Sequence, residues 1–358
     1  MTRASASELR RARLRAQLLS GSEASNVTDA TSRLLAVQAQ DLGSAYWALG
    51  VRTPGARRAD VSAALDSGAL VRSWPLRGTL QLVAAEDLRW LLGLTAQRQL
   101  RTAERTRAQL GLDATVVDRA RAAATEALSG GGRLDRAGMM AVFTAAGLDV
   151  SAGRGYQLIV QLAQTGTLVW GPVVRTQQAL VLLDEWVPPA APLDQDEALA
   201  RLVDRYLSGH GPATAADIAW WSGLPVTRIR RGAQAARVPV ADTDAGEVYL
   251  PDEPAPPAVP RGALLLPGFD EYLLGYQNRD LVLDPRHFGH IVPVRNGAFR
   301  PIVVKAGRVV AVWRAERSAA GAGVTITPFD EASALAPADL APALRRYGDF
   351  HGVRAWVP

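Results

Sequence analysis

Hydrophobic positions along the chain fall into three stretches that predict one order of elements: three helices followed by a β-hairpin. The middle stretch shows this order most clearly, with a first helix that ends at Gly130 and a second over 135–145. Ser151 can cap a third helix, and an extended pair with a turn at Gly171 and Pro172 follows. The first helix has one apolar face, formed by Val116, Val117, Ala120, Ala124 and Leu128. This order is typical of the winged helix, which binds DNA and also serves in protein contacts.

The third stretch repeats the pattern with a clear break between its helices. Thr214 and Asp217 have the spacing of a capping box, so a second helix should begin there. An arginine-bearing helix over 226–236 and a hairpin over 238–250 complete the stretch. The apolar stripe of its first helix consists of Leu199, Leu202, Val203, Tyr206 and Leu207.

The first stretch is looser but has the same order. Its first helix has Val27, Ala30, Leu34 and Leu35 on one face. Ser44 can cap the next helix, a short third helix fits 60–65, and two extended runs follow from Gly68.

The composition changes after residue 250. A proline-rich connector covers 251–257, and short apolar runs then predict strands over 264–266, 291–294, 301–305 and 309–313. Asn296-Gly297 and Ala306-Gly307 should form hairpin turns, and a helix fits 336–346. We therefore predict an α+β protein with three tandem winged-helix modules and a small barrel-like β-rich domain. The predicted domains are residues 1–110, 111–190, 191–258 and 259–358.

Composition and charge narrow the class of protein. The chain has 358 residues, 48% of them hydrophobic, and no cysteine, which excludes general disorder, thiol catalysis and disulfides. It has no run of 18 or more apolar residues and no apolar leader segment, so we expect a cytoplasmic protein without a membrane anchor. The net charge of +5 and 40 basic residues, all arginine except Lys305, favour an anionic partner such as nucleic acid. Codon bias in a chain rich in alanine and glycine explains the arginines equally well.

The chain offers few familiar catalytic or cofactor motifs. His287 and His290 have ligand-like spacing but no nearby pair of carboxylates, so we expect no metal site. Neither a phosphate loop nor a dinucleotide fingerprint nor a nucleophile elbow is found, and no cofactor is expected.

Two polar clusters remain as candidate sites. Gln38 and Gln40 are two residues apart at a predicted helix end, where both side chains can lean toward one cleft. In the hairpin after Trp74, the side chains of Arg77, Thr79 and Gln81 should alternate onto one face. That face, with Arg72 and Trp74, can contact phosphate and stack on a base. Both clusters also fit a simpler interpretation, a solvated helix end and the polar outer face of a half-buried hairpin.

Residues 36–41, which contain Gln38-Ala39-Gln40, and residues 72–80, which contain Arg77-Gly78-Thr79, resemble the bacterial winged-helix DNA glycosylases of the AlkZ/YcaQ type. Further matches cover 182–186, 297–301 and 307–310, and the resemblance extends over nearly the whole chain. It implies three tandem winged helices and a barrel-like domain in a C-shaped DNA clamp. It also implies double-stranded DNA with alkylated guanine as the partner and a monomeric enzyme.

The resemblance also assigns roles to residues. The catalytic Gln-apolar-Gln motif falls on Gln38, Ala39 and Gln40, as in the AlkZ-type branch, which unhooks bulky N7-alkylguanine adducts and interstrand crosslinks and often protects producers of alkylating natural products. The YcaQ-type branch, a housekeeping alternative, has Asp at the last position. Many members have His where this chain has Gln81, so the role of this residue is open. Phosphate contacts are expected from Arg72, Arg77, Arg228, Arg230 and Arg231.

The expected chemistry follows from the lesion. N7-alkylation makes guanine cationic and a good leaving group, so two glutamines need only position water or the deoxyribose. Asp41 should be a helper at best, because a helix would turn it about 100° from Gln40. A Schiff-base lyase step needs an amine, and no lysine lies near either cluster, so a monofunctional glycosylase is expected. The alternatives are a non-enzymatic winged-helix regulator of DNA and a module used only for protein contacts, which the arginines of 226–236 disfavour.

Overall fold

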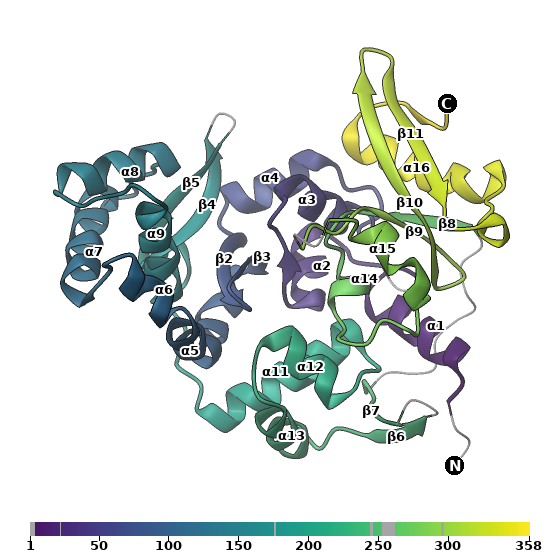
Figure 1. The fold of residues 1–358 in the computed structure, drawn as a ribbon, viewed down its shortest axis with the longest axis horizontal. Helices are drawn as coiled ribbons and strands as arrows, with labels where there is room; N and C mark the ends of the chain where they lie inside the picture. Colours follow the sequence, from purple (N-terminus) through teal and green to yellow (C-terminus); the bar gives the residue numbers. More distant parts are fainter. Residues whose placement is uncertain (1–3, 22, 175–176, 244–245, 253–261, 295–296) are drawn as a thin grey trace.

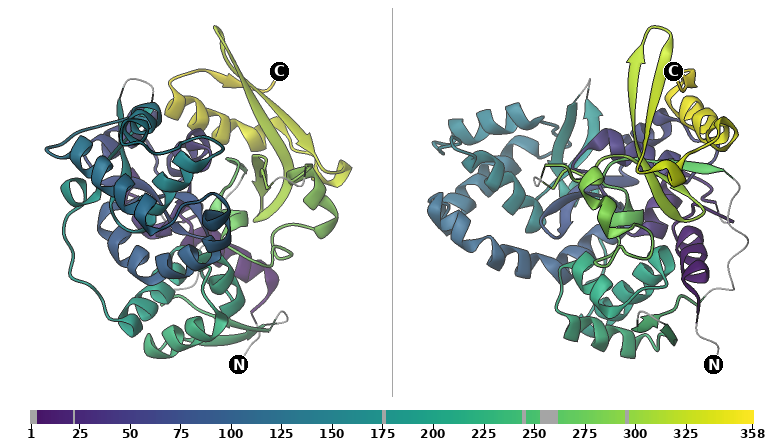
Figure 2. Two further views of the ribbon diagram at one scale, coloured as in Figure 1. Left: turned by 60° about the vertical axis from the view of Figure 1, so that its left-hand side comes forward. Right: turned by 45° about the vertical axis from the view of Figure 1, so that its right-hand side comes forward.

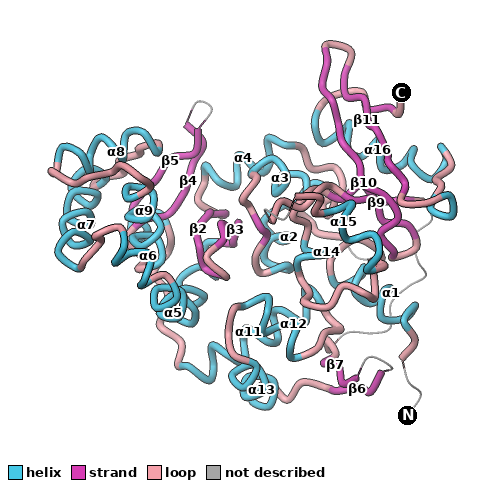
Figure 3. The backbone as a smooth tube through the Cα atoms, viewed as in Figure 1, coloured by secondary structure: helices cyan, strands magenta, loops and turns pink. Residues whose placement is uncertain are grey.

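The computed structural model describes residues 4–21, 23–174, 177–243, 246–252, 262–294 and 297–358. The predicted α+β class is confirmed, with helices and antiparallel strands mixed along the chain (Figure 1). Figure 3 shows strands near the centre and in a second group beside the C-terminus, with helices around both.

One five-stranded sheet joins the first two predicted modules. Its order is β1-β3-β2-β4-β5, with every neighbouring pair antiparallel. The two modules meet where β2 pairs with β4 at Arg72 and Trp170. They are therefore one continuous body rather than two separate units, and the predicted domain boundaries stay a prediction. The strands are β1 (Val37–Gln38), β2 (Leu70–Leu76), β3 (Thr79–Ala84), β4 (Leu168–Val174) and β5 (Gln177–Leu182).

The helices of this half follow the predicted order, with small shifts at their ends. Asp41, not Ser44, caps α3, because its carboxylate accepts from the Ser44 backbone N–H. Gly153, not Ser151, precedes α9, and Gly171 lies inside β4 rather than in a turn. The helices are α2 (Val27–Leu34), α3 (Leu42–Gly50), α4 (Arg58–Asp66), α5 (Ala85–Thr102), α6 (Glu104–Gln109), α7 (Ala114–Leu128), α8 (Arg136–Ala145), α9 (Arg154–Gln164) and α10 (Leu183–Trp186).

The third stretch forms the predicted three helices and hairpin. Thr214 and Asp217 form the predicted capping box, in which each side chain bonds the other residue's backbone N–H. The elements are α11 (Gln195–His210), α12 (Ala215–Ser222), α13 (Val226–Ala235), β6 (Val240–Thr243) and β7 (Gly246–Tyr249).

The C-terminal part contains a second five-stranded sheet, in the order β12-β11-β10-β9-β8. Among the described residues β8 and β12 remain edge strands, so the predicted barrel-like, β-rich domain is an open sheet that forms half a barrel. Figure 1 shows the β10–β11 hairpin projecting from the body. The elements are β8 (Ala263–Leu266), α14 (Glu271–Leu274), a 3₁₀ turn (Pro285–His287), α15 (Phe288–Ile291), β9 (Ile302–Lys305), β10 (Arg308–Ser318), β11 (Gly321–Pro328), a second 3₁₀ turn (Glu331–Ser333), α16 (Pro337–His351) and β12 (Ala355–Trp356).

Of the two turns, the strand over 291–294 and the connector expected in this part, one turn is confirmed, the strand is wrong, and the rest falls mostly outside the described residues. Ala306 and Gly307 form the predicted turn between β9 and β10. The strand predicted over 291–294 is wrong, since α15 ends there and Pro293 cannot donate to a ladder. Asn296 and most of the proline-rich connector lie outside the described residues.

The first module is the centre of the molecule. One hydrophobic core joins its helices to the C-terminal sheet, and a second joins it to α11–α13. Figure 1 shows the second module, the third module and the C-terminal sheet arranged around it, and Figure 2 shows the same arrangement from two sides. An unpredicted helix, α1 (Ala6–Ala16), lies between the third module and the C-terminal sheet, and Arg13 on it donates to the carbonyl of Pro212 at 3.0 Å. Segments far apart in sequence can therefore meet at the first module.

Candidate functional site

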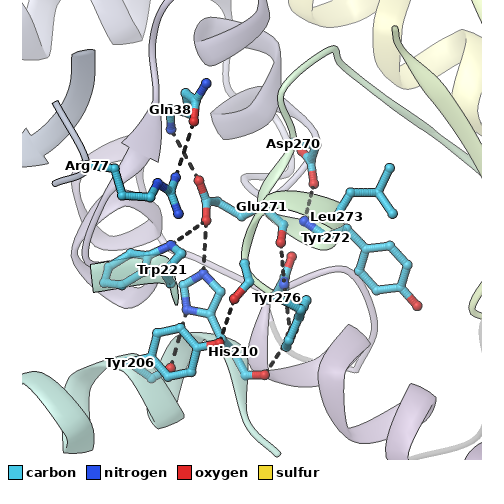
Figure 4. A network of polar contacts seen from close by, with 12 residues as sticks. Gln38, Arg77, Tyr206, His210, Trp221, Asp270, Glu271, Tyr272, Leu273 and Tyr276 are labelled. Atoms are coloured by element: carbon cyan, nitrogen blue, oxygen red, sulfur yellow. Dashed lines mark hydrogen bonds and ion pairs between the residues drawn. The ribbon is translucent and has the colours of Figure 1, made fainter. Parts of the chain in front are cut away.

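Gln38 lies in a strand rather than at a helix end. The helix before it stops at Leu34, and β1 pairs with β3 so that Gln38 faces Gln81 across the ladder. The Gln38 side chain is nearly buried, with 9% of the residue exposed. Its Oε1 accepts a hydrogen bond of 3.2 Å from Nη2 of Arg77 (Figure 4). An arginine has only donors, so the atom that faces it must be the amide oxygen, and the Gln38 NH₂ points away from Arg77.

Arg77 reaches Gln38 because of the turn between β2 and β3. Leu76 pairs with Thr79, so Arg77 and Gly78 alone make the turn, and both have positive φ. Two positive φ values are typical of the tight hairpin turn in which Asn-Gly is the usual pair. Arginine, unlike asparagine, seldom adopts this conformation, so Arg77 is strained, and such strain collects at functional sites. At Arg77 it places the guanidinium between Gln38 and the ring of Trp220, 4.7 Å away.

A buried carboxylate from the C-terminal part lies directly behind Gln38. Glu271, the first residue of α14, accepts the Gln38 backbone N–H at 3.3 Å through Oε1. Its Oε2 accepts the indole N–H of Trp221 at 2.8 Å and contacts Nε2 of His210 at 3.2 Å. Figure 4 shows Trp221 of α12 and His210 of α11 meeting at Glu271, with Gln38 of β1 beside it. The strand that holds Gln38 is therefore fixed by residues of the third module and of the C-terminal part.

The charge of Glu271 is stabilised despite its complete burial. Burial alone would raise the pKa of this carboxyl, but the His210 hydrogen bond and charge, with Arg77 and Trp221, lower the pKa below its usual value. Burial also lowers the pKa of Arg77, and the nearby charge of Glu271 counters part of this shift. Arginine nevertheless stays protonated at neutral pH. A buried negative charge thus balances a buried positive one beside Gln38.

His210 is held rigidly on the other side of Glu271. Its ring stacks on Tyr206, with 4.6 Å between centroids and 8° between planes. The hydroxyl of Tyr276 donates to the His210 carbonyl at 2.6 Å, and the hydroxyl of Tyr206 donates to the carbonyl of Gly275 at 2.6 Å. Because all these groups are buried, the network has no freedom to turn away from Glu271.

Unlike Gln38, Gln40 is neither buried nor held by hydrogen bonds within the described part of the chain. It is exposed and makes no hydrogen bond with any described residue. Asp41 follows it in an extended conformation as the cap of α3, so the helical angle expected between these two residues is wrong. One glutamine is thus held by its carbonyl, and the other is free to turn toward a substrate.

Arg72 holds the backbone between the two glutamines. Its Nε and Nη2 donate to the Ala39 carbonyl at 3.0 and 2.7 Å, and its Nη1 donates to Gln178 at 3.1 Å. Burial lowers the pKa of Arg72 to about 10, which leaves it charged at neutral pH. The guanidinium is directed at protein atoms, so this geometry does not support the predicted phosphate contact.

The bidentate grip on Ala39 leads to a prediction for Arg72→Lys. A lysine ammonium lacks the fork that binds Ala39 and Gln178 together, so the segment between the glutamines should loosen. We expect the single-turnover excision rate to fall about tenfold while the affinity for duplex DNA stays unchanged. Rates at saturating enzyme and a binding titration measure the two quantities separately. Weaker binding with a normal rate would instead support a phosphate contact.

The structure changes the roles expected for three hairpin residues. Trp74 is 1% exposed and packs edge-on against Tyr156, so it cannot stack on a base in this conformation. Gln81 is also 1% exposed, and its Nε2 donates to the hydroxyl of Thr79 at 2.7 Å. Thr79 and Gln81 do share a face, as predicted, but they bond each other beside Gln38 rather than facing solvent.

The arginines of α13 are distributed differently from one another. Arg230 is exposed, and Arg231 is exposed but pairs with Asp196 at 2.5 Å. Arg228 is half-buried, and burial together with the charges of Arg231 and Arg98 lowers its pKa. A DNA contact by these three residues stays a prediction, with Arg228 in the most basic surroundings.

Sequence reasoning missed Glu271, His210 and Trp221. The signal in the sequence is the acidic pair Asp270-Glu271 inside an otherwise apolar segment, because buried carboxylates need buried partners. Asp270 pairs with Arg52 through two hydrogen bonds of 2.8 Å, and both side chains are fully buried. Glu271 instead pairs with the Gln38 backbone and with Trp221 and His210.

The described residues contain no cluster of three or more histidine or acidic side chains suited to a metal ion. No helix in the described part of the chain is long and apolar enough to cross a membrane. The arrangement at Gln38 and Gln40 offers one oriented NH₂ donor and one free amide, beside positive charge, so it can position a substrate or a water by hydrogen bonds without proton transfer.

Comparisons with known proteins define the class. The fold is that of the solved structure of the DNA glycosylase AlkZ from Streptomyces sahachiroi, with a TM-score of 0.84, 24% identity and complete coverage of both chains. The interstrand DNA cross-link repair glycosylase of Streptomyces sahachiroi is 28% identical over 347 residues, or 90% of each chain. The model of the AlkZ-like DNA glycosylases matches residues 31–350. The chain therefore belongs to the AlkZ-like family and is a DNA glycosylase.

Proposed function

We propose that this glycosylase hydrolyses the N-glycosidic bond of N7-alkylated guanine in double-stranded DNA, including bulky adducts and interstrand crosslinks. The observation that carries the proposal is the held amide of Gln38 beside the free amide of Gln40. Neither group titrates, and such a pair suits a substrate that needs no strong acid or base. The cross-link repair named for the relative from Streptomyces sahachiroi supports the range of lesions.

The two glutamines have different roles in this proposal. As the C1′–N9 bond breaks, its electron pair neutralises the cationic base, and positive charge develops on the sugar. The Gln38 NH₂ donates to an oxygen of the lesion's nucleotide and fixes its position. Gln40 accepts a hydrogen bond from the water that attacks C1′, and that water finally loses its proton to solvent. Glu271, behind Gln38, offsets the positive charge of Arg77, which would otherwise oppose the developing sugar cation.

The enzyme should be monofunctional. The lone lysine, Lys305, lies in β9 and forms an ion pair with Asp339 at 2.7 Å. It contributes no amine to the Gln38 site, so no Schiff base is expected there. We further propose that the enzyme acts on DNA as a monomer in the cytoplasm.

The test is single-turnover excision from two duplexes, one with N7-methylguanine and one with an N7–N7 crosslink. Gln38→Ala and Gln40→Ala should each lose about 100-fold or more of the rate, and no strand cleavage by β-elimination should accompany excision. A methylguanine rate far above the crosslink rate would favour the housekeeping alternative. Binding without excision of either lesion would contradict the proposal and favour a non-enzymatic DNA-binding role.

The pH profile of the same reaction is a separate prediction. Gln38 and Gln40 do not titrate, and the lowered pKa of Glu271 keeps its carboxylate ionised at every working pH. The excision rate constant should therefore be flat between about pH 6 and pH 9. A bell-shaped profile at saturating enzyme would reveal an acid or base that this assignment lacks.

A further inference from the structure

A cavity borders Arg77 at the junction of all three helical parts, and Gln38 does not line it. It has a volume of about 420 Å³ and is bounded by the β2–β3 turn, α5, α6, α9 and the turn between α12 and α13. Tyr156 contributes the accessible aromatic surface of the wall, whereas Trp74 behind it is buried. Val160 and Leu224 contribute aliphatic surface. Its volume lies within the range of cavities that bind small organic ligands.

Two of the side chains that line this cavity each contain a buried polar atom that has no hydrogen-bond partner among the described residues. One is Nη1 of Arg77, a donor on the same guanidinium that binds Gln38 through Nη2. The other is Oε1 of Gln161, an acceptor on α9. Buried polar atoms without partners are costly, so both indicate a ligand that offers an acceptor and a donor together.

The outer part of the cavity is strongly basic. Arg98 and Arg107 line it, Arg98 is exposed, and neither side chain has a hydrogen bond or ion pair with a described residue. No aspartate or glutamate is among the residues that line the cavity. A ligand that is anionic at its outer end is therefore favoured.

We propose that this cavity binds a single nucleotide of the DNA, unstacked from the duplex, with its base inside and its phosphate at Arg98 and Arg107. A nucleobase edge carries both donors and acceptors, which matches Arg77 and Gln161, and its flat face suits the ring of Tyr156. The phosphate supplies the negative charge that no cavity residue offers to Arg98 and Arg107. A nucleotide thus offers partners to Nη1 of Arg77, to Oε1 of Gln161 and to the two outer arginines.

The nucleotide is an unmodified neighbour or partner of the lesion rather than the lesion. A cationic alkylated guanine would enter a cavity lined by arginines and without a carboxylate, which electrostatics opposes. Arg77 also links the cavity to Gln38, so an occupied cavity would hold the guanidinium that orients the proposed catalytic amide. This inference rests on the proposed function, because it takes DNA as the substrate.

Calorimetric titration of the full chain with small probes tests the proposal. Guanosine 5′-monophosphate should bind saturably, guanosine and inorganic phosphate alone should each bind at least tenfold more weakly, and 7-methylguanosine 5′-monophosphate should bind more weakly than the unmodified nucleotide. Arg107→Ala should weaken nucleotide binding about tenfold. Gln161→Leu should remove the preference of the nucleotide over phosphate. The matched control is Arg105→Ala on the same helix, an exposed arginine that does not line the cavity.

Each other outcome overturns the assignment in a recognisable way. Equal binding of phosphate and nucleotide would leave only an anion site, and tighter binding of the methylated nucleotide would put the lesion itself in the cavity. Equal effects of Arg107→Ala and Arg105→Ala would move binding elsewhere. These titrations need no excision, so a chain that binds the nucleotide but excises nothing would contradict the proposed function alone.

Discussion

Replacing Gln38 with glutamate is expected to lower the single-turnover rate constant for N7-methylguanine excision by about 100-fold, whereas Gln40→Glu should keep at least the normal rate. The two changes are chemically identical, so their different outcomes depend on position. Arg77 binds the Gln38 oxygen and leaves only the NH₂ for substrate, so a carboxylate at 38 has no donor to offer. At position 40 the free side chain needs only an acceptor for water, which a carboxylate supplies more strongly.

Saturating enzyme removes the effect of weaker DNA binding, which an added negative charge near phosphate would cause. Gln109→Glu is the matched control, because Gln109 is an exposed glutamine at the end of α6 that contacts none of the site residues. Its rate should equal that of the unmodified enzyme. A normal rate for Gln38→Glu would show that the amide does not act as a donor, and a reversed order of the two variants would exchange the roles of the glutamines.

The sequence predicts those parts of the fold that depend on local periodicity. The helix over 114–128 and the capping box of Thr214 and Asp217 lie where apolar spacing and cap residues place them. The site required more than periodicity. β1 has only two residues, and pairing with β3 creates it, so no pattern in 36–41 distinguishes it from a helix end.

The partners of Gln38 show why part of the site could not be predicted. Glu271 is 233 residues away in sequence, and it reaches the site because a common core packs the first module against the C-terminal sheet. Arg72 is a residue of the type that binds phosphate, yet it is half-buried and its guanidinium bonds the Ala39 carbonyl instead. Residue type alone cannot show whether an arginine faces solvent or the backbone of its own active site.

Glu271→Gln is expected to reduce both stability and excision strongly. The carboxylate accepts from Gln38, Trp221 and His210 within the protein interior. An amide at this position has one acceptor oxygen, and its NH₂ must face at least one of these donors. Breaking a buried charged network costs about 3–5 kcal/mol in the free energy of unfolding. The Gln38 backbone also loses a partner, so excision should fall even where the variant is fully folded.

Thermal unfolding at several pH values separates the charge of Glu271 from its shape. Its folded-state pKa lies below the usual value of 4.5, so the carboxylate stabilises the fold above that pH and loses its contribution as pH falls through the folded-state pKa. The stability difference between the unmodified enzyme and Glu271→Gln should therefore be full at neutral pH and shrink below about pH 5. Glu126→Gln, at an exposed position of α7, should show no such difference. A difference that stays constant into acid would mean that packing, rather than the charge behind Gln38, holds this site together.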